Sequence, residues 1–242
     1  MQNNNKDIPV AILAGGQGTR LSPLTDNLPK ALVEVGGKPV IEHVMDLYRG
    51  AGFERFVIAL GHLGDKLRTH FASRPGYHTE LVDTGQGTAS AGRLRRLAPQ
   101  LGDGTFMLTW CDGLSDLDVT RLLRFHLAHG RLATVTTVHP WSQFGHLTLE
   151  GDQVVSFAEK PMLWDQWING AFFVLQPEVM ELIDGDNVMW EREPMQRLVA
   201  QQQLMAYRHD GFWSCMDTLA DRARLETLVS DGAPWIKGKM NG

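Results

Sequence analysis

A short apolar run near the amino terminus, Ile8 to Leu13, ends directly in a loop that contains Gly15, Gly16 and Gly18. An apolar run of this length that stops at glycine is typical of a buried strand. Glycine lets the backbone approach a ligand closely, and successive N–H groups in such a loop can surround an anion. Because ligands of open α/β sheets bind beyond the carboxyl ends of the strands, the sequence predicts an anion-binding loop at that edge.

The rest of the chain extends this strand into a mostly parallel mixed sheet. A second buried strand is expected at 56–60, further strands at 79–82, 106–110 and 133–138, and helices at 39–48, 65–71, 90–101 and 118–129. Strands that alternate with helices imply parallel crossovers. The second part is expected to hold a hairpin that turns at 150–152, strands at 169–175 and 204–209, a helix that opens at Pro177, and a closing helix at 218–230.

The chain of 242 residues is long enough for one large core, and we expect a single α/β domain, Rossmann-like, over 1–242. The net charge of −5 gives no basic footprint for nucleic acid. No apolar run approaches a membrane span, and the polar segment from Met1 to Asp7 is not a signal peptide. Cys111 and Cys215 are expected to be free thiols in a cytoplasmic protein, without a membrane or nucleic-acid partner.

Basic residues accompany the glycine loop. Arg20 and Lys30 follow it and could neutralise a polyphosphate, with the arginine suited to bidentate contact. Taken alone, the loop is equally explained as a simple strand–helix turn. The dinucleotide pattern GxGxxG and the P-loop pattern both fail on spacing, which argues against a hydride-transferring enzyme and a P-loop enzyme.

Two aspartates are candidates for holding a metal ion. Asp112 follows the strand 106–110, where a carboxylate faces the ligand crevice, and Asp217 lies far away just before the closing helix. Each alone could equally be a turn or helix-cap residue. Mg²⁺ prefers one or two carboxylates together with substrate phosphates, which two aspartates meeting at a phosphate would supply.

The segment 15–21 reads GGQGTRL, and Pro29-Lys30 and Gly37-Lys38-Pro39 follow it. This combination resembles the amino-terminal signature of the sugar nucleotidyltransferases. The resemblance implies a Rossmann-like nucleotide-binding half over 8–138 and a sugar-binding and carboxyl-terminal half, partly antiparallel, over 139–242. It implies Mg²⁺ on Asp112 and Asp217. Nucleotide contacts are implied for Leu13, Ala14, Gly15, Gly16, Gly18, Thr19, Arg20, Lys30, Gly85 and Asp112.

The resemblance extends to the sugar side. Glu159-Lys160-Pro161 resembles the family's EKP motif, although a lone Glu-Lys pair is usually a surface ion pair. Ile168 to Leu175 resembles the strand whose Asn and Gly contact the sugar, although Asn at a strand start is often a turn residue. The sugar-phosphate contacts so implied are Gly92, Glu159, Lys160, Asn169, Gly170, Trp190 and Trp213, and the implied catalytic residues are Arg20, Lys30, Asp112, Lys160 and Asp217.

Several segments resemble the cytidylyl-transferring members of the family more than the thymidylyl or uridylyl members. They are 81–85, 92–94, 112–113 with 116–118, 144–145, 190–194, and 211–213 leading to Asp217. We therefore expect CTP and a sugar 1-phosphate, most simply glucose 1-phosphate, as substrates of a homo-oligomeric enzyme. Two departures are Cys111, where relatives carry glycine, and the segment 72–78, which is shorter than in relatives. Another nucleotide such as UTP or dTTP, another phosphorylated acceptor, or a sugar-nucleotide-binding regulator without catalysis stay open as alternatives.

Overall fold

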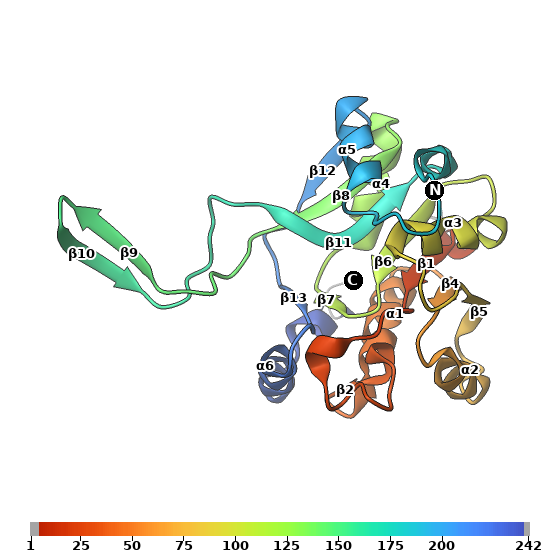
Figure 1. Ribbon diagram of the computed structural model, residues 1–242, viewed down its shortest axis with the longest axis horizontal. Helices are drawn as coiled ribbons and strands as arrows, with labels where there is room; N and C mark the ends of the chain where they lie inside the picture. Colours follow the sequence, from red (N-terminus) through yellow and green to blue (C-terminus); the bar gives the residue numbers. More distant parts are fainter. Residues whose placement is uncertain (1–4, 240–242) are drawn as a thin grey trace.

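A seven-stranded sheet forms the centre of the computed structural model, which describes residues 5–239 (Figure 1). The strand order is β12-β8-β11-β6-β1-β4-β5. Only β11 runs antiparallel to its neighbours in this sheet, which confirms the predicted mostly parallel mixed sheet. The strands are β1 (Val10–Leu13), β4 (Arg55–Leu60), β5 (His78–Asp83), β6 (Phe106–Trp110), β8 (Ala133–Val138), β11 (Ile168–Leu175) and β12 (Leu204–Arg208).

Helices cover both faces of the sheet because successive strand residues point to opposite sides. In β1, Val10 and Ile12 join one hydrophobic core, and Ala11 and Leu13 join the other. The first core is covered by α1 (Val40–Gly50), α2 (Gly64–Ala72), α4 (Val119–His129) and α6 (Leu219–Ser230). The second is covered by α3 (Ser90–Leu101), α5 (Glu193–Ala200) and the 3-10 helix η4 (Pro177–Leu182). No helix within 5–239 is both long and apolar enough to cross a bilayer.

Local capping explains where two of these helices begin. The Asp118 side chain accepts a hydrogen bond of 2.9 Å from Arg121 N and caps α4. Thr218 and Asp221 form a reciprocal capping box at the start of α6. Thr218, and not Asp217, is therefore the N-cap, so the capping explanation of Asp217 does not hold.

Short elements that the sequence analysis did not predict bring distant segments together. β7 (Gly113–Ser115) pairs antiparallel with β13 (Trp213–Cys215), and Met216 N donates to Asp112 O at 3.1 Å. This pairing sets the Asp112 and Asp217 segments side by side. The other short elements are β2 (Glu34–Val35), β3 (Lys38–Pro39), η1 (Asn5–Asp7), η2 (Thr19–Leu21), η3 (Lys30–Leu32) and η5 (Pro234–Lys239).

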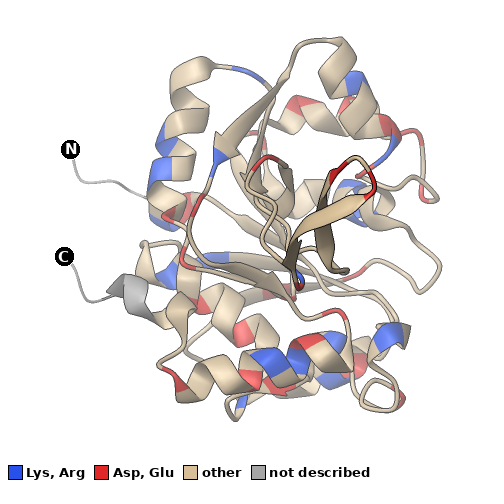
Figure 2. Cartoon of the chain, turned by 90° about the vertical axis from the view of Figure 1, so that its left-hand side faces the viewer, with Lys and Arg blue, Asp and Glu red and all other residues tan. Residues whose placement is uncertain are grey.

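A two-stranded hairpin projects from the body, as Figure 1 shows. It consists of β9 (His146–Glu150) and β10 (Gln153–Ala158), and we call residues 146–158 the arm. Every residue of both strands is exposed. The predicted turn is confirmed, since Gly151 at φ 60° supplies the left-handed conformation that a tight hairpin favours. Figure 2 looks toward the arm, whose only charged side chains are the acidic Glu150 and Asp152 at its tip and which carries no Lys or Arg.

The two segments that connect the arm to the body contact each other at its root. Ser142 N donates to Pro161 O at 2.8 Å, and Leu163 N donates to Pro140 O at 2.9 Å. The His139 ring lies 3.9 Å from the Trp167 ring between centroids, and its Nδ1 lies 2.8 Å from Gln166 O. These contacts tie the two connecting segments together where the arm begins.

A buried polar network lies at the end of the sheet opposite to the arm, where β8 begins and β11 ends. His126 is fully buried, and its Nδ1 lies 2.9 Å from Thr134 Oγ1. His126 Nε2 lies 2.9 Å from Gln176 Nε2, and His129 Nε2 lies 2.7 Å from the same Thr134 hydroxyl. Burial lowers the pKa of His126 to about 4, so the ring is neutral near pH 7.

Candidate active site

A cavity of about 460 Å³ opens beyond the carboxyl ends of β1 and β6. This is the edge at which the sequence predicts a ligand. Most of the residues predicted to contact nucleotide or metal line the cavity. They are Leu13, Ala14, Gly15, Gly16, Gly18, Thr19, Arg20, Lys30, Asp112 and Asp217.

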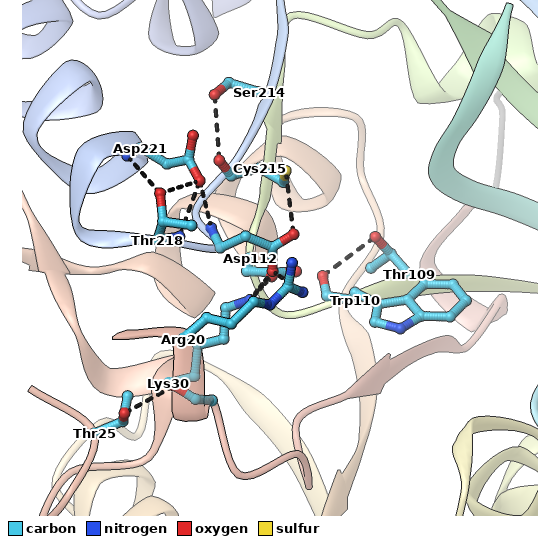
Figure 3. Close-up of polar contacts among 12 residues, drawn as sticks. Arg20, Thr25, Lys30, Thr109, Trp110, Asp112, Ser214, Cys215, Thr218 and Asp221 are labelled. Carbon is cyan, nitrogen blue, oxygen red and sulfur yellow. Dashed lines mark hydrogen bonds and ion pairs between the residues drawn. The ribbon is translucent and has the colours of Figure 1, made fainter. Parts of the chain in front are cut away.

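Four charged side chains converge in this cavity, and Figure 3 shows three of them labelled, Arg20, Lys30 and Asp112. Lys30 Nζ contacts Asp112 Oδ2 and lies 2.6 Å from Asp217 Oδ1. Arg20 Nη2 lies 2.9 Å from the same Asp217 oxygen, although the two residues are 197 positions apart in sequence. The fold thus assembles two carboxylates and two cations at one point.

The pKa values in this cluster respond to burial and to neighbouring charge. Burial raises the pKa of Asp112 above its usual value, and the Lys30 ammonium offsets this only in part. Burial also acts to raise the pKa of Asp217, but Lys30 and Arg20 outweigh it and hold that pKa below its usual value. Burial acts to lower the pKa of Lys30, yet the carboxylates, Asp112 first, raise it above its usual range. Lys30 is therefore a permanent cation near neutral pH.

The two carboxylates suit a hard divalent cation. Mg²⁺ takes oxygen ligands and is usually held by one or two carboxylates, with water and substrate phosphates at the other positions. No group of three or more His, Cys, Asp and Glu side chains in the described part of the chain is placed to hold a metal ion. Asp112 and Asp217 provide the one or two carboxylates that such a cation usually takes from a protein.

The glycine loop is packed too tightly for side chains at one of its positions. A Cβ atom at Gly15 would lie 2.2 Å from Arg93 Nη1, which leaves no room for any residue but glycine without displacing the guanidinium. Gly18 adopts φ 65°, a left-handed conformation that glycine tolerates best. The loop therefore forms part of the cavity wall with backbone rather than with long side chains.

Arg93 is a site residue that the sequence analysis missed. It lines the cavity, is only 5% exposed, and Nη1 donates to Leu60 O at 3.0 Å and to Gly85 O at 2.8 Å. Nη2 donates to Gln86 O at 3.2 Å, so one guanidinium joins β4 to the 84–87 loop beside the glycine loop. Burial lowers the pKa of Arg93. The sequence did contain a signal for this role, because Arg93 is a charged residue beside Leu94 and Leu97 on the buried side of a helix.

Residues predicted for the sugar side lie outside this cavity. Glu159 and Lys160 are exposed just beyond the arm, and Lys160 has a φ of 44°. Asn169 Oδ1 accepts a 2.8 Å hydrogen bond from Ala171 N, which is a local turn contact. Trp213 Nε1 donates to Gly170 O at 2.8 Å, and Trp213 lines a separate cavity of about 230 Å³. The sugar-side residues are therefore not assembled around the cavity of about 460 Å³, which we call the nucleotide cavity after the contacts predicted for its lining residues.

Three residues predicted to contact substrate do not line this cavity. Trp190 is fully buried in the second core, edge-on to Phe173, and does not reach the cavity. Gly92 lies inside α3, where a Cβ would meet the Asp186 backbone at 2.4 Å, so this glycine serves helix packing. Gly85 lines a neighbouring cavity, and Gln86 is the residue of that loop that borders both.

The two cysteines behave as predicted. Both are free thiols. Cys111 belongs to the first core and also lines the nucleotide cavity, and burial raises its pKa to about 12. Cys215 Sγ donates to Asp217 Oδ2 at 3.7 Å, and burial followed by the Asp217 charge raises its pKa to about 12. Neither thiol is poised as a nucleophile near neutral pH.

Known proteins resemble this chain over most of its length. Residues 10–217 match the family described as nucleotidyl transferase. Glucose-1-phosphate cytidylyltransferase of Salmonella typhi is 42% identical, with 93% of this chain and 97% of the relative covered. A Bacillus subtilis (strain 168) protein named as a probable glucose-1-phosphate cytidylyltransferase is 36% identical, with 91% and 96% covered.

A solved structure supports the fold. UDP-glucose pyrophosphorylase complexed with UDP-glucose superposes with a TM-score of 0.72 over 93% of this chain and 98% of that chain. The two sequences are 16% identical, so this likeness concerns the fold alone. It agrees with the central sheet flanked by helices that Figure 1 shows.

Proposed function

The chain belongs to the nucleotidyl transferase family, and we propose that it transfers the cytidylyl group of CTP to glucose 1-phosphate, giving CDP-glucose and pyrophosphate. The observation that carries the proposal is the convergence of Arg20, Lys30, Asp112 and Asp217 at one cavity beside a glycine loop. Identity of 42% to a glucose-1-phosphate cytidylyltransferase over nearly the whole chain supports the choice of both substrates.

The proposed chemistry is an in-line displacement at phosphorus. An oxygen of the sugar phosphate forms a bond to the α-phosphorus of CTP, while the bond from that phosphorus to the oxygen bridging toward the β-phosphate breaks. The attacking oxygen is already anionic near neutral pH, so no general base is needed. Charge repulsion and misalignment are the main barriers, and positioning with electrostatic stabilisation lowers them.

Each residue of the cavity has a part in this scheme. The glycine loop presents backbone N–H groups to the triphosphate, Arg20 binds the leaving pyrophosphate, and Lys30 neutralises the phosphates. Asp112 and Asp217 would hold Mg²⁺, which would supply Lewis-acid charge at the phosphates. Arg93 fixes the 84–87 loop beside the glycine loop and so shapes the wall of the nucleotide half, 8–138.

The acceptor is assigned to the second half, 139–242. Lys160 pairs with the sugar phosphate and Glu159 with sugar hydroxyls in this proposal, and Asn169 and Gly170 contact the sugar. Glu159 and Lys160 follow directly on the arm and precede β11, so a movement at the arm root or a neighbouring subunit is required to bring them to the cavity.

A homo-oligomer is part of the proposal, and one face of the arm supports it. The cross-strand pairs Leu147–Phe157 and Leu149–Val154 lie on one face, and their side chains are between 51% and 63% exposed. The opposite face carries the polar pairs Thr148–Ser156 and Glu150–Gln153. An isolated two-stranded hairpin is marginal in water, and an apolar sheet face needs a covering layer. A second copy of the chain carries the same uncharged face and is the proposed cover.

We assign the reaction to the cytoplasm, where nucleoside triphosphates are made. Reducing conditions there keep free thiols such as Cys111 and Cys215 reduced. No nucleic acid takes part in the proposed reaction.

The decisive experiment measures pyrophosphate release from purified protein with Mg²⁺, a panel of nucleoside triphosphates and a panel of sugar 1-phosphates. Release with CTP and glucose 1-phosphate that EDTA abolishes is the expected result. Release with another pair, such as UTP or dTTP with a different acceptor, would contradict the substrate assignment and keep the metal site. Binding of CTP without release from any pair would contradict catalysis and favour a sugar-nucleotide-binding regulator.

A further inference from the structure

The Lys30 ammonium lies between the two carboxylates of the cavity. Its Nζ contacts Asp112 Oδ2 and lies 2.6 Å from Asp217 Oδ1, and the three side chains are 16%, 13% and 28% exposed. Arg20 Nη2 lies 2.9 Å from Asp217 Oδ1 as well, but its side chain is 69% exposed. Two negative charges are thereby balanced by two positive charges of the chain itself, with Lys30 as the better-buried partner of both aspartates.

The same two carboxylates, Asp112 and Asp217, are the ones that would hold a divalent cation. Mg²⁺ binds oxygen ligands at about 2.0–2.1 Å, which is closer than an ammonium approaches a carboxylate. An ammonium that remained on these oxygens would occupy their lone pairs and would repel the metal ion at short range. Loading of a divalent cation on Asp112 and Asp217 therefore requires Lys30 to move.

The chain holds the Lys30 backbone in place but leaves its side chain able to move. Lys30 opens η3, where the neighbouring Ala31 and Leu32 are buried. A lysine side chain has a flexible four-carbon stem, so the ammonium can move while the backbone stays in place. A partly buried ammonium that loses its carboxylates without gaining another anion is unfavourable. The phosphates of a nucleotide bound at the glycine loop, which lines the same cavity, are the anion within reach.

We propose that Lys30 is an internal counter-ion that closes Asp112 and Asp217 to divalent cations until nucleotide phosphates draw the ammonium away. Lys30 then has two positions, between the carboxylates in the free protein and on the phosphates in the complex. Because the two events are linked, divalent cation and nucleotide raise each other's affinity. The inference rests on the proposed function only in taking a nucleoside triphosphate as the polyphosphate.

The test is a titration of the nucleotide-free protein with Mn²⁺, with the free ion followed by electron paramagnetic resonance. The wild-type protein is expected to bind Mn²⁺ weakly. The Lys30→Met variant is expected to bind it about 5- to 150-fold more tightly, the usual range of a coupling between two sites. Arg20→Met is expected to give a smaller gain, since Arg20 contacts Asp217 alone and is largely exposed.

Matched variants test whether the gain in Mn²⁺ affinity arises at Asp112 and Asp217. Lys38→Met removes a lysine that is paired with Asp46 outside the cavity, and it is expected to leave Mn²⁺ binding unchanged. Asp217→Asn added to Lys30→Met is expected to abolish the gain. Lys30→Gln, checked like the others by circular dichroism and thermal unfolding, serves where Lys30→Met does not fold.

Equal Mn²⁺ affinity of the wild-type protein and of the folded Lys30 variants would overturn the proposal, whether that affinity is weak or strong. The titration contains neither nucleotide nor sugar phosphate, so its result does not depend on the assignment of CTP and glucose 1-phosphate. A protein that releases no pyrophosphate with these substrates but gains Mn²⁺ affinity on Lys30→Met would contradict the proposed function alone.

Discussion

The nucleotide cavity and the arm root differ in how far a single chain completes them. At the cavity, Lys30 joins carboxylates from two distant segments, and Arg93 joins β4 to the adjoining loop. At the arm root, Glu159 and Lys160 are exposed and have no place in the cavity lining. The difference teaches that the fold of one chain assembles the proposed donor side, whereas the proposed acceptor side depends on a later movement or on another subunit.

The largest effect is expected on the assembled side. Asp217→Asn removes one of the two carboxylates that the proposed metal ion needs, and we expect turnover to fall on the order of 10²–10³-fold. Thermal unfolding should change little, because Thr218 rather than Asp217 caps α6. Steady-state pyrophosphate release and a melting curve measure the two quantities. An unchanged rate would remove Asp217 from the site.

Arg93→Lys tests how much the 84–87 loop contributes to the donor side. Lysine keeps the charge but carries all its donors on one nitrogen. It therefore cannot reproduce the hydrogen bonds that the two guanidinium nitrogens make to Leu60, Gly85 and Gln86, and the loop loses part of its support. We expect the KM for CTP to rise about tenfold and the KM for glucose 1-phosphate to stay within about twofold. An equal rise of both constants would show that the loop does not serve the nucleotide in particular.

Lys160→Ala tests the acceptor side and should show the reverse selectivity. Loss of a charge-assisted hydrogen bond to the sugar phosphate should raise the KM for glucose 1-phosphate about 10-fold, with a smaller change for CTP. Initial rates over a grid of both substrates separate the constants. A larger effect on the KM for CTP would sink the assignment of Lys160.

Leu149→Asp tests whether the arm needs a second copy. The substitution places a carboxylate on the apolar face, where Leu149 is 58% exposed. It should lower the molar mass of the assembly, measured by light scattering after size-exclusion chromatography. CTP binding measured by calorimetry should persist, because the nucleotide cavity lies in the body. Glu150→Gln at the arm tip is the matched control and should keep the wild-type mass. A monomeric wild-type protein would contradict the oligomer.

An effect on stability concerns neither side. His126 has a pKa of about 4 in the folded protein and about 6.5 when unfolded, so the unfolded chain binds more protons between these values. Stability is full above pH 6.5 and is lost as pH falls toward 4, with a loss at pH 5 of about 2 kcal/mol. Urea unfolding at pH 7 and pH 5 should show a smaller loss for His126→Asn than for wild type. Equal losses would contradict this assignment.

Elements whose patterns are local can be predicted from the sequence. The helix 90–101 and the strands 106–110 and 133–138 were predicted at their observed ends, because apolar spacing and turn residues mark them. The glycine loop was predicted to contact nucleotide and both aspartates to hold a metal ion, and the structure places all of them at one cavity. These residues carry recognisable motifs, so their signal does not depend on tertiary contacts.

Other features depend on contacts that no local pattern encodes. β7 and β13 are three residues each and exist because they pair with one another across about a hundred positions. Trp190 was predicted near substrate on its neighbours alone, yet Phe173 and the second core enclose it. Arg93 was missed because a buried guanidinium satisfied by carbonyl groups can be identified only once the loop geometry is known.

The reversed direction of β11 has a consequence for how an enzyme of this kind can diversify. β8 ends and β11 begins at the edge where β6 delivers Asp112, so the excursion from Val138 to Ile168 leaves and returns on that side. Were β11 parallel to its neighbours, its first residues would emerge at the opposite edge. The connection can therefore lengthen, shorten or change sequence without disturbing the sheet, and each change alters what is presented next to the donor.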